Sequence, residues 1–339
     1  MPREFVELHA QMRSVARDVL STGRPDWTLL TRAGWPGLEI AETLGGSGVS
    51  FAETALVAEE LGRAAALGPH LGVMLAVGAL LAIGDDANRN RLLARTAEGG
   101  ERPVAVLPTG ENPGSAFRLH DDQSVDGTAE FVPDAGQATR LLIPARAPDG
   151  TMVLADCAPS QLIVTPQPVL DETRALATVP AERSPADRIW PLPALACLID
   201  RGAVAVAADS LGLAEAMLKG TVDYVGMRHQ FGRPIGSFQA VKHACADMLV
   251  KIRVARQLVD VAVDAIVDGG DTSASAAMAK AYATETAVFV AGTAMQLHGG
   301  IGYTWESGIH VYLKRAGLNR SLFGSPRAHR RTLAARYAR

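Results

Sequence analysis

Residues 228–239 carry the densest group of side chains in this sequence that could bind a ligand. The stretch holds two arginines, two phenylalanines and two glutamines. Pro234 and the neighbouring glycines oppose helical hydrogen bonding, so we expect a tight link between two helices. Loops on a rigid helical scaffold commonly carry binding groups. The alternative is an ordinary helix connector with solvated charges.

Two long segments with helical periodicity flank this link. Before it, small and apolar residues recur on one face from Ala203 to Val225. After it, apolar residues alternate in steps of four and three from Val241 to Ile266. Such a seam indicates a long helix in a bundle, which buries one face against other helices, against a second subunit, or both.

The remainder of the chain changes its pattern twice. The first hundred residues or so are helical in periodicity, and short β-branched runs bounded by Gly, Pro and Asp then indicate a small, mostly antiparallel sheet. Helical patterns return at about Leu195. We therefore predict an α+β, mainly α fold. Its parts are an N-terminal helical domain over 1–102, a β-domain over 103–188 and a C-terminal helical bundle over 189–339.

Composition excludes several classes of protein. The formal net charge is -3 and there is no basic block, which argues against nucleic acid as a partner. Three cysteines without CxxC spacing argue against a disulfide framework or a metal site and fit the cytoplasm. The N-terminus lacks the apolar core of a signal peptide. The most apolar run, 67–84, contains His70 and glycines, so we expect a buried helix and no membrane span.

Two motifs in this sequence resemble those of the acyl-CoA dehydrogenase superfamily. Residues 228–239 are similar to its R-x-x-F-G-x-P-I…Q signature, and residues 296–304 to its Q-x-x-G-G-x-G-Y/F element. Fainter similarities over 34–63 and 169–174 follow in the same order. The resemblance implies an N-terminal helical domain, a middle β-domain and a C-terminal four-helix bundle. It also implies an FAD cofactor and an acyl-CoA substrate that is oxidised to a 2,3-enoyl-CoA.

In that superfamily both motifs contact FAD, the first of them across a subunit interface. The matching residues of this chain are Arg228, Phe231, Ile235, Phe238, Gln239, Gln296, Gly299 and Gly300. An arginine offers a fixed fork to the FAD pyrophosphate, and glycines let the backbone approach the cofactor. The alternatives are core packing for Phe231 and Ile235, and a plain helix stop for the glycines.

The glutamate that serves as catalytic base in the superfamily is missing from both of its known places. Its usual place, after the G-G-x-G-Y element, corresponds to Phe323, which cannot accept a proton. The minority place, early in the helix before the link, corresponds to Gly202. Asp200 is a nearby carboxylate, but a shift of two residues on a helix changes the face, and a base must lie within hydrogen-bond reach. The base is therefore unknown, with Asp200 as a candidate.

A second departure concerns the flavin ring. The superfamily elements T-E-x-x-x-G-S-D and W-I-T/S, which touch the ring, correspond to 107–115 and 131–134, and neither matches. The elements expected to touch the flavin ring thus depart from the superfamily pattern. The two motifs expected to contact the FAD of a neighbouring subunit keep that pattern.

These departures favour a chain that lends its FAD contacts to a partner subunit. Heteromeric acyl-CoA dehydrogenases in which a short subunit pairs with a full-length one occur in the superfamily, notably in bacterial breakdown of steroid side chains. We hypothesise such a heterotetramer, with a homodimer as the other assembly. Three alternatives stay open: a self-sufficient dehydrogenase with a relocated base, a flavin-dependent hydroxylase or oxidase, and a non-catalytic structural subunit. The acyl group is not predicted.

Overall fold

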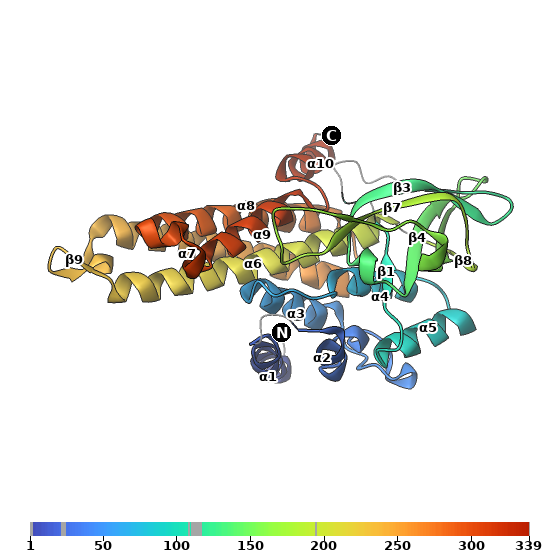
Figure 1. Cartoon of the computed structure of the whole chain (residues 1–339), viewed down its shortest axis with the longest axis horizontal. Helices are drawn as coiled ribbons and strands as arrows, with labels where there is room; N and C mark the ends of the chain where they lie inside the picture. The colour runs from blue at the N-terminus through green and yellow to red at the C-terminus, as the bar shows by residue number, and fades with distance from the viewer. Residues whose placement is uncertain (1–2, 22–24, 108, 110–116, 194, 339) are drawn as a thin grey trace.

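The computed structural model describes residues 3–21, 25–107, 109, 117–193 and 195–338. Helices come first, a sheet follows, and long helices complete the chain (Figure 1). The predicted mainly α, α+β fold is confirmed. The three domain ranges given above stay a proposal.

The N-terminal section is built from helices that pack on one another and on the bundle. They are α1 (Arg3–Leu20), α2 (Trp27–Arg32), α3 (Phe51–Arg63), α4 (Leu71–Leu81) and α5 (Ala87–Ala97). Ser50 and Glu53 form a reciprocal capping box that fixes the start of α3. All but the last residue of α4 are buried, as its uniformly apolar sequence predicts. None of the helices described is both long and apolar enough to span a bilayer.

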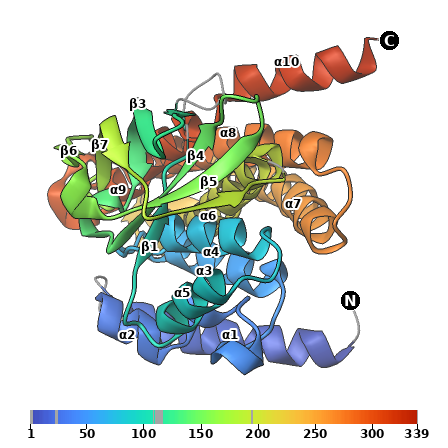
Figure 2. The same ribbon diagram turned by 90° about the vertical axis from the view of Figure 1, so that its right-hand side faces the viewer.

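The middle section is a twisted sheet in the order β6-β7-β3-β2-β4-β5-β8, with β1 paired to β4. Its pairs are antiparallel except β1 with β4 and β2 with β4, which are parallel. The helix α4 lies between the sheet and the helices α2 and α5 (Figure 2). The strands are β1 (Pro103–Ala105), β2 (Phe117–Leu119), β3 (Ser124–Pro133), β4 (Arg140–Arg146), β5 (Met152–Cys157), β6 (Thr165–Gln167), β7 (Leu176–Pro185) and β8 (Arg188–Pro191).

The C-terminal section is dominated by long helices that run side by side along the longest axis (Figure 1). They are α6 (Leu195–Met227), α7 (Gln239–Val267) and α8 (Ser273–Leu297), followed by α9 (Ile309–Ser321) and α10 (Pro326–Tyr337). The predicted seam of α7 faces inward, with Met248, Ile252, Ala255, Val259 and Ala262 buried. The sheet lies at one end of the bundle and the link between α6 and α7 at the other (Figure 1).

Close backbone contact fixes α3 against α6. A Cβ atom on Gly212 would lie 1.9 Å from the carbonyl oxygen of Glu59, and one on Gly62 would lie 1.9 Å from that of Asp209. Only glycine allows two helices to approach so closely. The N-terminal helices and the bundle therefore share one apolar core.

Candidate functional site

The link between α6 and α7 is a short hairpin of β9 (His229–Gln230) and β10 (Arg233–Pro234). Phe231 occupies its turn with a φ of 53°, which is rare for a bulky residue, and its side chain is 92% exposed. Core packing is therefore the wrong interpretation of Phe231. Its ring meets Phe238 edge-on at 6.1 Å, and the guanidinium of Arg233 lies 4.1 Å from the Phe238 centroid. Phe238 therefore lies between the Arg233 guanidinium and the exposed Phe231 ring.

The second motif lies where α8 ends. Gly299 has a φ of 62° and begins the 3₁₀ turn η6 (Gly299–Tyr303), so it also serves as a helix stop. A Cβ atom on Gly299 or Gly300 would meet no atom within 4 Å. On Gly302 it would lie 2.4 Å from the carbonyl oxygen of Met295. The first two glycines thus present open backbone, whereas Gly302 is required by packing.

The two motifs, far apart in the sequence, meet at one cleft of about 400 Å³. No carboxylate stands among the described residues that line it, and Arg228 gives it a positive charge. Of the predicted residues, Phe231, Phe238 and Gln239 are outside the lining and belong to the hairpin and the start of α7. The lining consists of Tyr224, Arg228, Gln230, Ile235, Gln296, Leu297, His298, Gly299, Gly300 and Ile301.

Sequence reasoning missed some residues of this cleft. Tyr224 precedes Arg228 by one helical turn, so the same helix face carries both, and this spacing could have indicated it. His298 lies inside the second motif, beside residues that were predicted. Gln230 lies inside the first. An amide, an imidazole and a phenol therefore join the guanidinium at the cleft.

The two places for a catalytic glutamate lie against each other. Gly202 is on α6, and Phe323 follows α9 with a φ of 54° and 2% exposure. A Cβ atom on Gly202 would lie 2.6 Å from Cε1 of the Phe323 ring. The ring of Phe323 therefore fills the space between the two positions, and no carboxylate of either residue is there.

Buried polar groups hold the segment that carries Phe323. The Lys280 ammonium donates to the carbonyl oxygen of Gly324 at 2.9 Å, and Nε2 of His329 lies 2.8 Å from the carbonyl oxygen of Phe323. Burial, with a smaller effect of the Arg320 charge, lowers the pKa of Lys280 to about 7. Burial and the charge of Lys280 likewise lower the pKa of His329 to about 4. Neither group contacts a carboxylate in the described part of the chain.

The candidate base Asp200 is engaged elsewhere. Its Oδ2 accepts a hydrogen bond from Oγ1 of Thr272, the residue before α8, at 2.7 Å. Burial raises the pKa of Asp200. Because it precedes Gly202 by two residues on α6, it points roughly 200° around the helix from that position.

Arg201, next to Gly202, fills the space between α3, α4 and α6. Its guanidinium pairs with Glu39 and lies 4.2 Å from the centroid of the Phe51 ring. A Cβ atom on Gly78 of α4 would lie 2.6 Å from Nε of Arg201, so glycine admits the side chain there. The surroundings of the vacant base position are thus filled by the chain's own side chains.

Comparison with known proteins decides the family. The acyl-CoA dehydrogenase C-terminal domain matches residues 194–338, and the N-terminal domain matches residues 1–100. Acyl-CoA dehydrogenase IpdE2 of Mycolicibacterium smegmatis is 37% identical over 98% of this chain and 94% of the relative. This chain belongs to the acyl-CoA dehydrogenase family. Its predicted enzyme class, a flavoprotein oxidoreductase of that family, is confirmed.

Two further proteins are similar over most of the chain. The acyl-CoA dehydrogenase IpdE2 of Mycobacterium tuberculosis is 38% identical over 89% of this chain and 83% of the relative. A solved structure, a variant of the Tcur3481-Tcur3483 steroid ACAD, superposes with a TM-score of 0.87 at 27% identity and covers 99% of both chains. The acyl-CoA dehydrogenase fold therefore extends over 99% of the chain.

The strand that faces the flavin ring in other acyl-CoA dehydrogenases is described only in part here. Residues 108 and 110–116 lie outside the described structure, so the comparison with T-E-x-x-x-G-S-D is not resolved by it. Phe131 of β3 has a φ of 56° and donates its N–H to Oε1 of Gln167 at 2.8 Å. Phe131 and Pro133 belong to the segment 131–134, which in the sequence does not match W-I-T/S.

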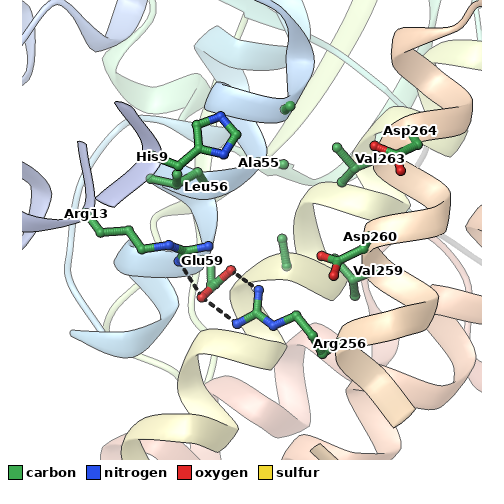
Figure 3. A pocket seen from close by; sticks show the side chains of 12 residues that line it. His9, Arg13, Ala55, Leu56, Glu59, Arg256, Val259, Asp260, Val263 and Asp264 are labelled. Carbon is green, nitrogen blue, oxygen red and sulfur yellow. Dashed lines mark hydrogen bonds and ion pairs between the residues drawn. The ribbon is translucent and has the colours of Figure 1, made fainter. Parts of the chain in front are cut away.

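A different cleft, of about 380 Å³, lies between α1, α3, α6 and α7 (Figure 3). Glu59 accepts hydrogen bonds there from Arg256 at 2.5 and 2.8 Å and from Arg13 at 2.6 Å. Burial opposes ionisation, but Arg256 and Arg13 outweigh it and lower the pKa of Glu59 to about 2. We call Arg13, Arg17, Arg63, Arg256, Glu59, Glu60 and Glu215 the arginine–glutamate cluster.

The arginine–glutamate cluster ties the N-terminal helices to the bundle. Its carboxylates are all paired with its own arginines, so it is a structural device and not a ligand site. Within the described ranges, no group of three or more His, Cys, Asp or Glu side chains could hold a metal ion.

Proposed function

We propose that this chain is a subunit of an FAD-dependent acyl-CoA dehydrogenase that offers its cleft to the FAD of a partner subunit. One observation carries the proposal: the cleft and the base position lie far apart on one helix. Gly202 and Arg228 are 26 positions apart (228 − 202), along α6 and one residue beyond it. At 1.5 Å per residue this is roughly 39 Å, beyond the reach of one extended dinucleotide. The cleft therefore serves a flavin other than one above Gly202.

The residues of the cleft fit a pyrophosphate. The Arg228 guanidinium supplies a charged fork, and the Gln296 amide is a further donor. The open backbone at Gly299 and Gly300 lets phosphate oxygens approach the N–H groups. The exposed ring of Phe231 offers an apolar contact on the adjoining hairpin. Bound at this cleft and in the partner, FAD would supply the acceptor for a hydride from the β-carbon of the acyl group.

The missing base supports a partner with its own glutamate. At the two family positions this chain has the Phe323 ring and the bare Cα of Gly202, and neither accepts a proton. Loss of a general base costs about 10²- to 10⁴-fold in rate. Asp200 is hydrogen-bonded to Thr272 and lies on a different face of α6 from Gly202, which argues against it as a relocated base. We therefore propose that the active enzyme is a heteromeric assembly. A homo-oligomer of this chain alone should be nearly inactive.

One similar solved structure supports a proposal for the substrate class. The similar solved structure is a steroid ACAD, and we propose for this chain a CoA thioester derived from a steroid. A cytoplasmic location agrees with three free cysteines in the described structure.

Co-expression with a full-length acyl-CoA dehydrogenase subunit from the same genome tests the proposal. We expect the mixed complex to contain bound FAD and to form enoyl-CoA. We expect no dehydrogenase activity from the lone chain, because it lacks the catalytic base. Arg228→Ala should lower FAD content, whereas Arg253→Ala, an exposed arginine on α7, should not. Strong activity of the lone chain would refute the proposal. A colourless mixed complex would favour a structural subunit, and oxygen consumption by the reduced complex would favour an oxidase.

A further inference from the structure

Tyr224 and His298 form a stacked pair within the cleft. Their ring centroids are 4.2 Å apart with an interplanar angle of 18°. The Tyr224 hydroxyl also donates to the carbonyl oxygen of His298 at 3.3 Å. The last turn of α6 therefore holds both the ring and the backbone of His298, at the residue that precedes Gly299.

A second hydrogen bond fixes which ring nitrogen of His298 is available. Nδ1 lies 2.7 Å from the carbonyl oxygen of Ala294, and a carbonyl only accepts, so Nδ1 carries the proton. Nε2 has no hydrogen-bond partner among the described residues. In the neutral ring Nε2 is an acceptor, and in the charged ring it is a donor. The charged ring is therefore the form that can bind an anion.

The positive charge of Arg228 alone does not balance a bound pyrophosphate, so a second cationic group in the cleft would help to bind it. A pyrophosphate diester carries two negative charges, whereas Arg228 is the one arginine or lysine among the described lining residues. Beside His298, the titratable or charged groups among the described lining residues are Tyr224 and Arg228 of α6, and Tyr303 of η6 donates its hydroxyl to Oε1 of the lining residue Gln296. On α9, His310 and Lys314 both pack on Trp305. No carboxylate in this set competes for the imidazolium.

We infer that His298 binds a phosphate of the nucleotide that occupies the cleft, and that Tyr224 is its positioning residue. This inference rests on the proposed function and names the pyrophosphate as the part of the cofactor that the ring contacts. Stacking on Tyr224 and the bond to Ala294 restrict the ring before the ligand arrives, so little rotational freedom is lost on binding. The residue type matters because a leucine of similar size would fill the space without a donor.

The test uses the full chain and two probes. ADP-ribose carries a pyrophosphate diester whose charge is constant near neutral pH, and adenosine carries no phosphate. A charge-assisted hydrogen bond contributes about 1.5–3 kcal/mol, so His298→Leu should weaken ADP-ribose binding by roughly 10- to 100-fold in calorimetry. Adenosine binding should not change.

Further variants separate binding from packing. His310→Leu is the matched control, because His310 packs on an aromatic ring nearby but does not line the cleft. Tyr224→Phe keeps the stack and removes the hydroxyl, and Tyr224→Leu removes both. We expect a small loss of ADP-ribose affinity for Tyr224→Phe and a larger loss for Tyr224→Leu.

The outcomes distinguish this inference from the proposed function. Unchanged ADP-ribose affinity in His298→Leu, or an equal loss for adenosine, would overturn the phosphate contact while the nucleotide cleft stands. Wild-type affinity in Tyr224→Leu would overturn the positioning role. Absence of both ADP-ribose and FAD binding to the wild type would overturn the role of the cleft itself.

Discussion

The ring of Phe323 packs so closely on Gly202 that a Cβ atom there would lie 2.6 Å from Cε1 and 2.8 Å from Cδ1. Gly202 is on α6 and Phe323 follows α9, so the two residues are far apart in the sequence. Each is a position at which we predict from the sequence that the family's catalytic glutamate is missing. A large residue at one place thus requires the smallest residue at the other.

Because of this contact, we expect a single methyl group added at Gly202 to destabilise the chain. Gly202→Ala should lower the free energy of unfolding by about 1–3 kcal/mol, because the methyl group overlaps a buried ring. Gly220→Ala is the matched control on the same helix, where a Cβ atom meets nothing within 4 Å. There we expect a gain of about 0.5–1 kcal/mol from helix propensity. Denaturant titration measures both, and addition of Phe323→Leu should restore part of the loss in Gly202→Ala.

Lys280 should make the chain more stable in mild alkali. Its folded-state pKa is about 7, against 10.5 for an ordinary lysine. Between these values the unfolded chain binds the extra proton, so the free energy of unfolding rises with pH by an amount on the order of 4 kcal/mol. Below about pH 7 the cost of burying the charge is fully present. Lys280→Met should abolish this rise in urea titrations at several pH values, and an identical slope in both proteins would contradict the argument.

Glu59 should contribute stability that is lost in acid. Its folded-state pKa is lowered from 4.5 to about 2. The stabilisation, roughly 3 kcal/mol, is complete above the unfolded pKa and disappears as the pH falls from about 4.5 to 2. Glu59→Gln should flatten this part of the pH profile and should cost about 3–5 kcal/mol at neutral pH. In Glu285→Gln, which breaks an exposed pair with Arg330, the cost should stay below about 1 kcal/mol.

Phe231 should matter for binding and not for the fold of the lone chain. Its side chain is 92% exposed and its backbone has a φ of 53°. Phe231→Ala should change the free energy of unfolding of the lone chain by no more than about 0.5 kcal/mol. In the mixed complex, FAD affinity should fall by about tenfold, as expected for a lost apolar anchor. Tyr337→Ala, at an exposed aromatic residue of α10, should leave FAD affinity unchanged.

The sequence by itself determined the elements of this protein and the residue types of its two motifs. Helical periodicity placed α6, α7 and α8, because the core-facing stripe of a long helix repeats within a short window. The motifs were visible for the same reason, since Arg228 with Phe231, and Gln296 with Gly299, are local in sequence. The absence of a glutamate at Gly202 and Phe323 was likewise a property of single positions.

The tertiary structure alone decided what those residues meet. It joined the end of α6 to the end of α8 as one cleft and brought Tyr224 onto His298. It also packed Phe323 on Gly202 and committed Asp200 to Thr272. These are contacts between distant segments, and they depend on how helices cross and how closely their backbones approach. Such crossings are set by packing of the whole core, which no local pattern of residues encodes.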